Sequence, residues 1–214
     1  MKTITISIIF AYFIQVGFCN PDRKDLFRVK DGYTLATIHF IDSTSIQGYA
    51  KIIDMLGSST IKFKLTEDGK PDSWNENDLK GVTMHSELMD IVFHYVKLKN
   101  YSNPKLVELV EHGEISVYAK VDSNWVDNSN SNSTSIDGLS AFVPSHREVS
   151  YQLFVIKDNE QEAISLGKAI NFKKIAKEYF KNCPGIINKI DEMKFKIGDV
   201  LEMVQYYNDF CAEL

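Results

Sequence analysis

Basic residues are too few in this chain to balance its acidic residues. Lysine and arginine total 24, aspartate and glutamate total 29, and the net charge at pH 7 is −5. A protein that binds nucleic acid needs a surplus of positive charge that neutralises successive phosphates. The charge balance therefore excludes nucleic acid as a partner.

Enzyme motifs are missing as well. The five histidines include no His-Glu-x-x-His pair for zinc, and neither common glycine-rich phosphate loop is present. The segment around Ser140 approaches the nucleophile elbow of serine hydrolases, but Phe142 stands where the elbow needs a small residue. We therefore assign no catalytic residue, no cofactor and no metal.

The residues nearest to a metal-binding pattern are His85, Glu87 and His94. In an extended segment the side chains of His85 and Glu87 would share a face, and both residue types bind zinc. A turn with incidental polar residues explains the same three residues, and we prefer that interpretation.

The one long apolar run lies at the N-terminus. Lys2 precedes an apolar segment at residues 4–18, which is too short to span a bilayer and is followed at once by polar residues. We interpret residues 1–19 as a signal peptide and expect a secreted or periplasmic, cell-envelope protein. No second apolar stretch in the remaining sequence is long enough to cross a membrane.

The predicted cleavage site lies between Cys19 and Asn20, where Gly17 and Cys19 supply the small side chains that signal peptidase requires. The alternative is a lipid anchor on Cys19, but Phe18 is bulky where a lipobox carries glycine or alanine. Cleavage would leave 195 residues, enough for one folded unit. Lys2 is the only charge lost, so the mature net charge would be −6.

Cysteine is scarce, and only Cys183 and Cys211 would remain after cleavage. In an oxidising compartment the expected state of such a pair is a disulfide. Two buried free thiols are the alternative, which export disfavours because a secreted protein is not kept reduced.

Between Tyr33 and Leu166 the pattern is typical of short strands separated by turns. The clearest case is the alternation of Ile61, Phe63 and Leu65 with two lysines, which predicts a strand with one buried face. The other expected strands are 33–40, 46–53, 79–84, 91–98, 106–110, 115–121 and 151–157. With no helix between them, about eight strands should pair as an antiparallel meander that curls into a bent sheet or partial barrel.

A helical period replaces the strand period after Gly167. Pro184 ends a first amphipathic helix and begins a short second one, and residues 197–211 form a last helix. The sequence therefore predicts an α+β chain with a β-rich body at 20–167 and a helical segment at 168–214 packed on it. Residues 122–147, rich in Ser and Asn, are expected to form a flexible loop.

A resemblance adds to this layout. A helix leading into Asn182-Cys183-Pro184 and a final Tyr206-Tyr207-Asn208-Asp209-Phe210-Cys211 resemble a family of secreted proteins from Bacteroidota, especially flavobacteria. The match is strongest over about the last 65 residues and loose over the strands. The resemblance implies an exported protein in two parts with both late cysteines, and it supplies no activity.

These observations favour a non-catalytic envelope or extracellular module that binds a protein or a cell-surface component. Trp74 and Trp125 are its candidate surface contacts, because both lie in polar, loop-like surroundings. A half-buried lid explains each tryptophan as well, and we prefer that interpretation. The alternative is a carrier that encloses a small apolar ligand among inward strand residues such as Ile61, Phe63, Ile91 and Phe93. A hydrolase without recognisable motifs comes third.

Overall fold

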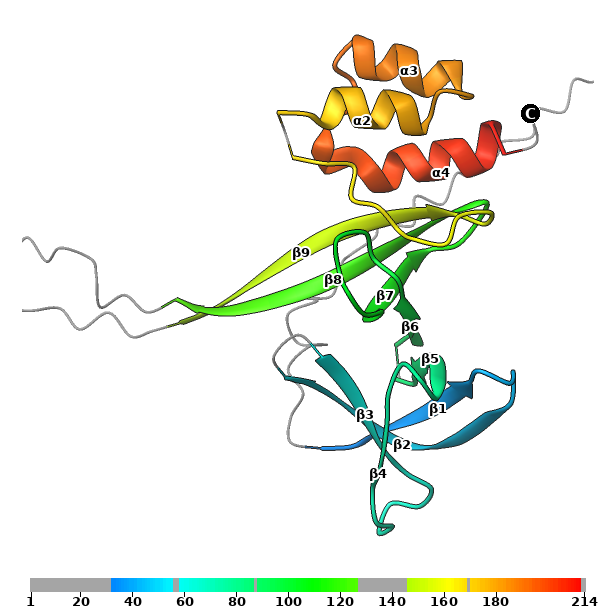
Figure 1. Ribbon diagram of the computed structural model, residues 1–214, viewed down its shortest axis with the longest axis vertical. Helices are drawn as coiled ribbons and strands as arrows, with labels where there is room; N and C mark the ends of the chain where they lie inside the picture. Colours follow the sequence, from blue (N-terminus) through cyan, green and yellow to red (C-terminus); the bar gives the residue numbers. More distant parts are fainter. Residues whose placement is uncertain (1–31, 56–57, 87, 127–145, 169, 213–214) are drawn as a thin grey trace, which may run out of the picture. The chain divides into compact units, whose positions relative to one another are not determined.

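The computed structural model describes residues 32–55, 58–86, 88–126, 146–168 and 170–212, all within the compact unit Asp31–Leu214 (Figure 1). The predicted signal peptide and its cleavage site at Cys19 and Asn20 lie outside the described residues. No helix in these ranges is long and apolar enough to cross a membrane. The described chain is an antiparallel sheet followed by helices, which confirms the predicted α+β class.

The sheet has nine strands in the described ranges. They are β1 (Thr34–Phe40), β2 (Ser45–Met55), β3 (Ser58–Lys64), β4 (Asp72–Trp74), β5 (Leu79–Met84), β6 (Ile91–Val96), β7 (Lys105–Glu111), β8 (Ile115–Val126) and β9 (His146–Lys157). The strand that the sequence pattern did not predict is β4, which is three residues long and places Trp74 in the sheet. Leu65 lies just beyond β3 and is 67% exposed, so its predicted place on the buried face is wrong.

The strand order is β4-β3-β2-β1-β5-β6-β7-β8-β9, so β5 pairs with β1 and not with its predecessor β4. Only residues 75–78 connect β4 to β5, although three strands separate them in the sheet. The first five strands must therefore curl strongly. The rings of Phe40 and Trp74 meet across this curl at 5.3 Å, and the Tyr95 hydroxyl of β6 donates to the Ser59 carbonyl of β3. The sheet is curled and not closed.

The inward face of the curl is filled with apolar side chains. Strand alternation places Ile61 and Phe63 on this face, where they are 0% and 6% exposed, while Lys62 between them points outward. The Phe63 ring also fills the space beside Gly48, since a Cβ at Gly48 would lie 2.5 Å from that ring. The Phe63 side chain of β3 therefore occupies the inward side of β2 at Gly48.

Three α-helices and one 3-10 helix follow the sheet: α2 (Phe172–Tyr179), α3 (Pro184–Asp191), η2 (Ile197–Asp199) and α4 (Val200–Phe210). They pack on the inward face where it continues over β8 and β9. Val117 and Val155 of these strands share one core with Phe180 and Met203. Asn171 lies at the N-cap position of α2, but its side-chain oxygen accepts from the Lys168 backbone and not from the helix.

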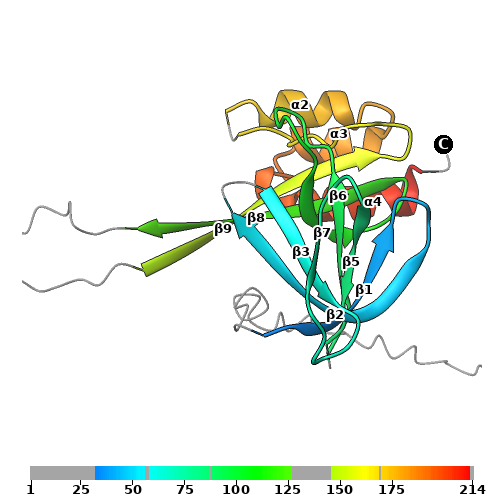
Figure 2. The same ribbon diagram turned by 60° about the horizontal axis from the view of Figure 1, so that its bottom comes forward.

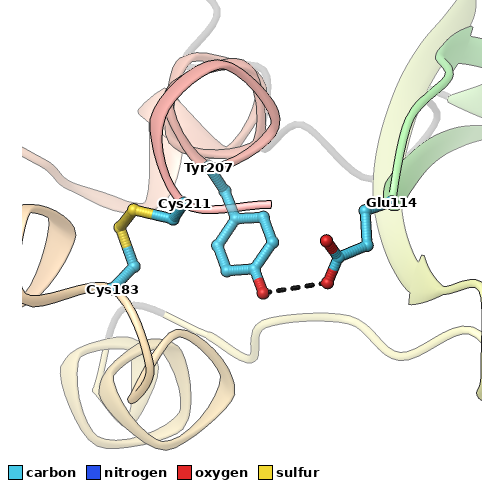
Figure 3. The surroundings of a disulfide bond; sticks show 4 residues. All are labelled: Glu114, Cys183, Tyr207 and Cys211. Carbon is cyan, nitrogen blue, oxygen red and sulfur yellow. Dashed lines mark hydrogen bonds between the residues drawn. A yellow bond between two sulfur atoms is a disulfide. The ribbon is translucent and has the colours of Figure 1, made fainter. Parts of the chain in front are cut away.

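The Cys183–Cys211 disulfide joins the start of α3 to the end of α4, as the sequence predicted (Figure 3). Beside it, the Tyr207 hydroxyl donates to the Glu114 carboxylate at 3.1 Å. The Asn208 amide both donates to and accepts from the Ile115 backbone of β8, at 2.9 and 3.0 Å. These contacts fix α4 on the sheet.

Strands β8 and β9 extend into the segment that was expected to be a loop. Their register runs from Ile115↔Lys157 to Val126↔His146, whereas the register of β7 with β8 ends at Ala119. Both views show the two strands running on together as a ribbon (Figures 1 and 2). Residues 127–145, the centre of the predicted loop, lie outside the described residues.

Candidate functional site

The outward face of the curled sheet carries a group of histidines. In the register, Gly81 of β5 lies between His39 of β1 and His94 of β6, so both histidines project from the same side. His85 follows the end of β5 on this side. We call His39, His85 and His94 the histidine group.

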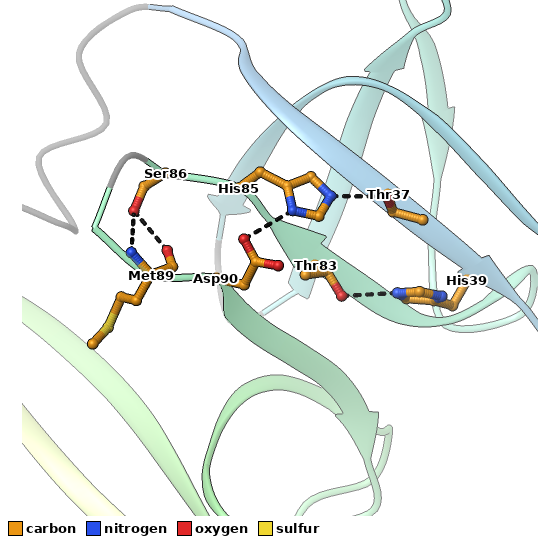
Figure 4. Close-up of polar contacts among 7 residues, drawn as sticks. All are labelled: Thr37, His39, Thr83, His85, Ser86, Met89 and Asp90. Atoms are coloured by element: carbon orange, nitrogen blue, oxygen red, sulfur yellow. Dashed lines mark hydrogen bonds and ion pairs between the residues drawn. The ribbon is translucent and has the colours of Figure 1, made fainter.

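Hydroxyl and carboxylate partners hold two of these rings (Figure 4). His39 Nε2 lies 2.8 Å from Thr83 Oγ1, and His85 Nε2 lies 2.9 Å from Thr37 Oγ1. The other ring nitrogen of His85 lies 2.9 Å from Asp90 Oδ1. Both nitrogens of His85 are therefore occupied by protein partners, and the ring orientation is fixed.

His94 is the most enclosed member of the group. Its Nδ1 lies 3.1 Å from the Tyr118 hydroxyl. Burial lowers the pKa of His94, and positive charge on His39 and His112 lowers it further. The pKa of His39 is lowered by its own burial and then by His85. Burial therefore favours the neutral form of His39 and His94, whose imidazoles serve as hydrogen-bonding groups.

The histidine group does not form a metal site in the described ranges. His85 and His94 have separate partners, and Glu87, the third residue of the sequence pattern, lies outside the described residues. Among the residues that can be placed, no three His, Cys, Asp or Glu side chains gather closely enough to hold an ion.

A hollow lies farther along the same outward face, over β8 and β9. Its volume is about 280 Å³, and its lining residues are Lys99, Asn100, Tyr101, Gln152, Phe154 and Ser165. We call it the Tyr101 hollow. Phe154 lies opposite Tyr118 in the register, and the Tyr118 hydroxyl reaches His94. Tyr118 and Phe154 also belong to a buried apolar cluster with Leu98, Val107 and Ala163. The hollow and the histidine group therefore lie on the same face of the sheet, at the edges of this cluster.

The backbone around Tyr101 is held in place by hydrogen bonds. The Lys97 ammonium donates to the carbonyls of Tyr101 and Ser102, each at 2.8 Å. The Lys99 amide donates to the Ala163 carbonyl at 2.9 Å, which ties this segment to the loop that carries Ser165. The rim of the hollow is thus formed before any ligand arrives.

Of the two tryptophans predicted as surface contacts, the structure describes the side chain of Trp74 but not that of Trp125. Trp74 is half-buried at the end of β4 with its ring edge-on to Phe40, and its indole nitrogen is buried without a hydrogen-bond partner among the described atoms. Trp125 pairs with Arg147 in the β8–β9 ribbon, and its side chain lies outside the described part.

The sequence pattern did not predict the Tyr101 hollow. Its lining comes from a loop at 99–101 and from residues 152–165, and only the fold brings these segments together. One part of the lining could have been predicted, because alternation in the expected strand at 151–157 places Gln152 and Phe154 on one face.

The outward face of the sheet thus carries two candidate functional features, the histidine group and the Tyr101 hollow. Comparison of the chain with protein-family models, with curated proteins and with solved structures gave no match.

Proposed function

We propose that this chain is an exported, non-catalytic module of the cell envelope or extracellular space that binds a surface component through its outward polar face. The observation that carries the proposal is the contrast between the two faces of the sheet. The inward face is packed with apolar side chains throughout, whereas the outward face has a smaller buried apolar cluster and, at its edges, fixed polar groups and an open hollow. Fixed polar groups at a hollow are the usual features of a recognition surface.

The carrier alternative has less support from the packing. A carrier needs free space among the inward residues, yet Ile61, Phe63 and Phe93 are 0%, 6% and 8% exposed and belong to the core. Ile91, the fourth residue named for a carrier, is half-buried. An apolar ligand would have to displace these side chains, at the cost of their close packing. Binding on the outward face requires no such displacement.

The compartment in this proposal rests on two features. The disulfide between Cys183 and Cys211 is typical of proteins that function in an oxidising environment. The apolar N-terminal segment has the composition of a signal peptide. We also propose that the chain belongs to the secreted Bacteroidota family that its C-terminal pattern resembles. The mature chain would begin at Asn20 and would carry no lipid on Cys19.

A thermal-shift screen of the mature chain, Asn20–Leu214, tests the proposal. A ligand that binds only the folded state raises the unfolding midpoint. We expect a rise with fragments of envelope polysaccharide and no rise with fatty acids or haem. A rise with a fatty acid or haem would instead establish a carrier. Intact-mass measurement of the exported protein tests the cleavage site and would reveal a lipid on Cys19.

A further inference from the structure

We infer that the Tyr101 hollow binds a carboxylated sugar unit of an anionic polysaccharide. The inference rests on the proposed function, because it names the surface component that the module would recognise. Three properties of the hollow carry it: an aromatic wall, paired amide groups and positive charge.

The aromatic wall is formed by Tyr101 and Phe154. Their rings meet edge-on, with centroids 6.3 Å apart and planes at 74°. Phe154 is buried and holds the half-buried Tyr101 ring in place at the rim. Because Phe154 is only 2% exposed, the Tyr101 ring is the aromatic surface that can pack against the C–H face of a sugar ring, whereas a simple anion such as phosphate gains nothing from it.

The polar lining matches hydroxyl groups. Asn100 and Gln152 each carry an amide with both donors and an acceptor, and Ser165 adds a hydroxyl. Sugar hydroxyls also donate and accept, so they can pair with all three side chains. Gln152 and Phe154 are two residues apart on β9 and therefore project from the same face.

Positive charge beside the ring selects for an acidic sugar. The Lys99 side chain lines the hollow, and the ammonium groups of Lys105 and Lys120 lie 5.7 and 5.6 Å from the centre of the Tyr101 ring. Lys105 and Lys120 lie over the ring and are not part of the lining, so Lys99 is the lysine placed to contact a ligand in the hollow. An ammonium group forms a stronger hydrogen bond with a carboxylate than with a neutral hydroxyl.

The size and rigidity of the hollow fit one sugar ring. A volume of about 280 Å³ is at the lower end for small-molecule sites, which suits a single unit and not a large ligand. The Lys97 bonds to the carbonyls of Tyr101 and Ser102 hold the rim in place, so little ordering remains to be done on binding.

NMR titration of the mature protein with sodium glucuronate tests this inference, with glucose and acetate as probes of the ring and the carboxylate alone. We expect glucuronate to bind with a dissociation constant on the order of 1 mM and to perturb the amides around residues 99–101 and 152–154. Gln152→Ala should weaken binding about fivefold to tenfold, and Lys99→Gln about tenfold. Lys181→Gln, at an exposed lysine paired with Glu178 on the helices, is the matched control and should change nothing.

The inference is overturned if glucuronate does not bind, if glucose or acetate binds equally well, or if Gln152→Ala and Lys99→Gln behave like Lys181→Gln. The thermal-shift screen separates this result from a failure of the proposed function. If envelope fragments still raise the midpoint of both the wild type and Gln152→Ala, the module binds its component elsewhere. If they raise neither midpoint, the proposed function fails as well.

Discussion

Position 81 can hold only glycine without moving the sheet. A Cβ built there would lie 2.0 Å from the Phe93 carbonyl oxygen and 3.0 Å from the His94 Cα, both backbone atoms of β6. Backbone in a central strand cannot move aside as a flexible side chain can. The missing side chain also leaves His39 and His94 facing each other across β5.

We expect Gly81→Ala to lower the free energy of unfolding by about 2 kcal/mol or more, the usual cost of overpacking. Gly198→Ala is the matched control, because a Cβ there meets nothing within 4 Å. That change should be neutral or should stabilise by about 0.5 kcal/mol, since alanine restricts the unfolded chain. Urea unfolding of the mature protein measures both, and equal effects would contradict the predicted clash.

The lowered pKa of His94 predicts a dependence of stability on pH. The unfolded chain takes up this proton near the ordinary pKa of 6.5, while the folded chain resists it because the ring is buried near His39 and His112. The contribution to stability is therefore complete above the unfolded pKa and is lost as pH falls through the lowered, folded pKa.

Replacing this histidine should reduce that dependence. We expect the free energy of unfolding of the wild type to fall between about pH 7 and about pH 5, and His94→Gln to fall less over the same range. Urea titrations at several pH values measure the slope, with Lys181→Gln as a control that leaves it unchanged. A slope in His94→Gln as steep as in the wild type would assign the effect to other groups.

At the scale of elements, the disulfide constrains the helices. Cys183 precedes α3 and Cys211 follows α4, 28 residues apart, and both are buried. Closing a loop of this length restricts the unfolded chain by about 3.5 kcal/mol on the chain-entropy account. Cys183→Ser and Cys211→Ser should each lower the free energy of unfolding by a similar amount.

The double variant provides the decisive comparison. Either single change removes the whole bond, so Cys183→Ser/Cys211→Ser should be little worse than one single change. Losses that simply add would show two separate thiols. Thiol labelling of the unfolded, unreduced protein should find no reactive cysteine in the wild type.

Local periodicity made the helices and most strands predictable. Phe172, Ala176 and Tyr179 are buried on one side of α2, as the helical spacing indicated. Strand β4 was missed because Asp72-Ser73-Trp74 is too short to show alternation and follows a turn-like segment. The pairing of β1 with β5 joins residues 39 to 48 positions apart, and nothing in the local pattern records it.

The outward surface depends on the whole fold in the same way. The residues of the Tyr101 hollow come together only after β9 has paired with β8 and the loop after β6 has been tied to Ala163. Trp74 is half-buried beside Phe40, as the preferred interpretation expected, but its partner could not be predicted because Phe40 comes from a distant strand.

For the whole molecule, the predicted boundary at Gly167 divides the sequence but not the core. Ile115, Val117 and Val155 of the sheet are buried together with Phe180 and Met203 of the helical segment. Burying each such side chain is worth about 1.5–3 kcal/mol. Exposing the three sheet residues alone would cost about 5 kcal/mol or more, which is comparable to the total stability of many domains.

We therefore expect a chain that stops at Gly167 to lack a cooperative unfolding transition and to bind a hydrophobic dye strongly, whereas Asn20–Leu214 should melt in one step. Circular dichroism melts and dye fluorescence of the two chains measure this. Because the helices cover β8 and β9 on the inward face, their removal also takes away the support beneath Gln152 and Phe154 on the outward face. A truncated chain that melts cooperatively at the same midpoint would show that the strands are self-sufficient and the helices an addition.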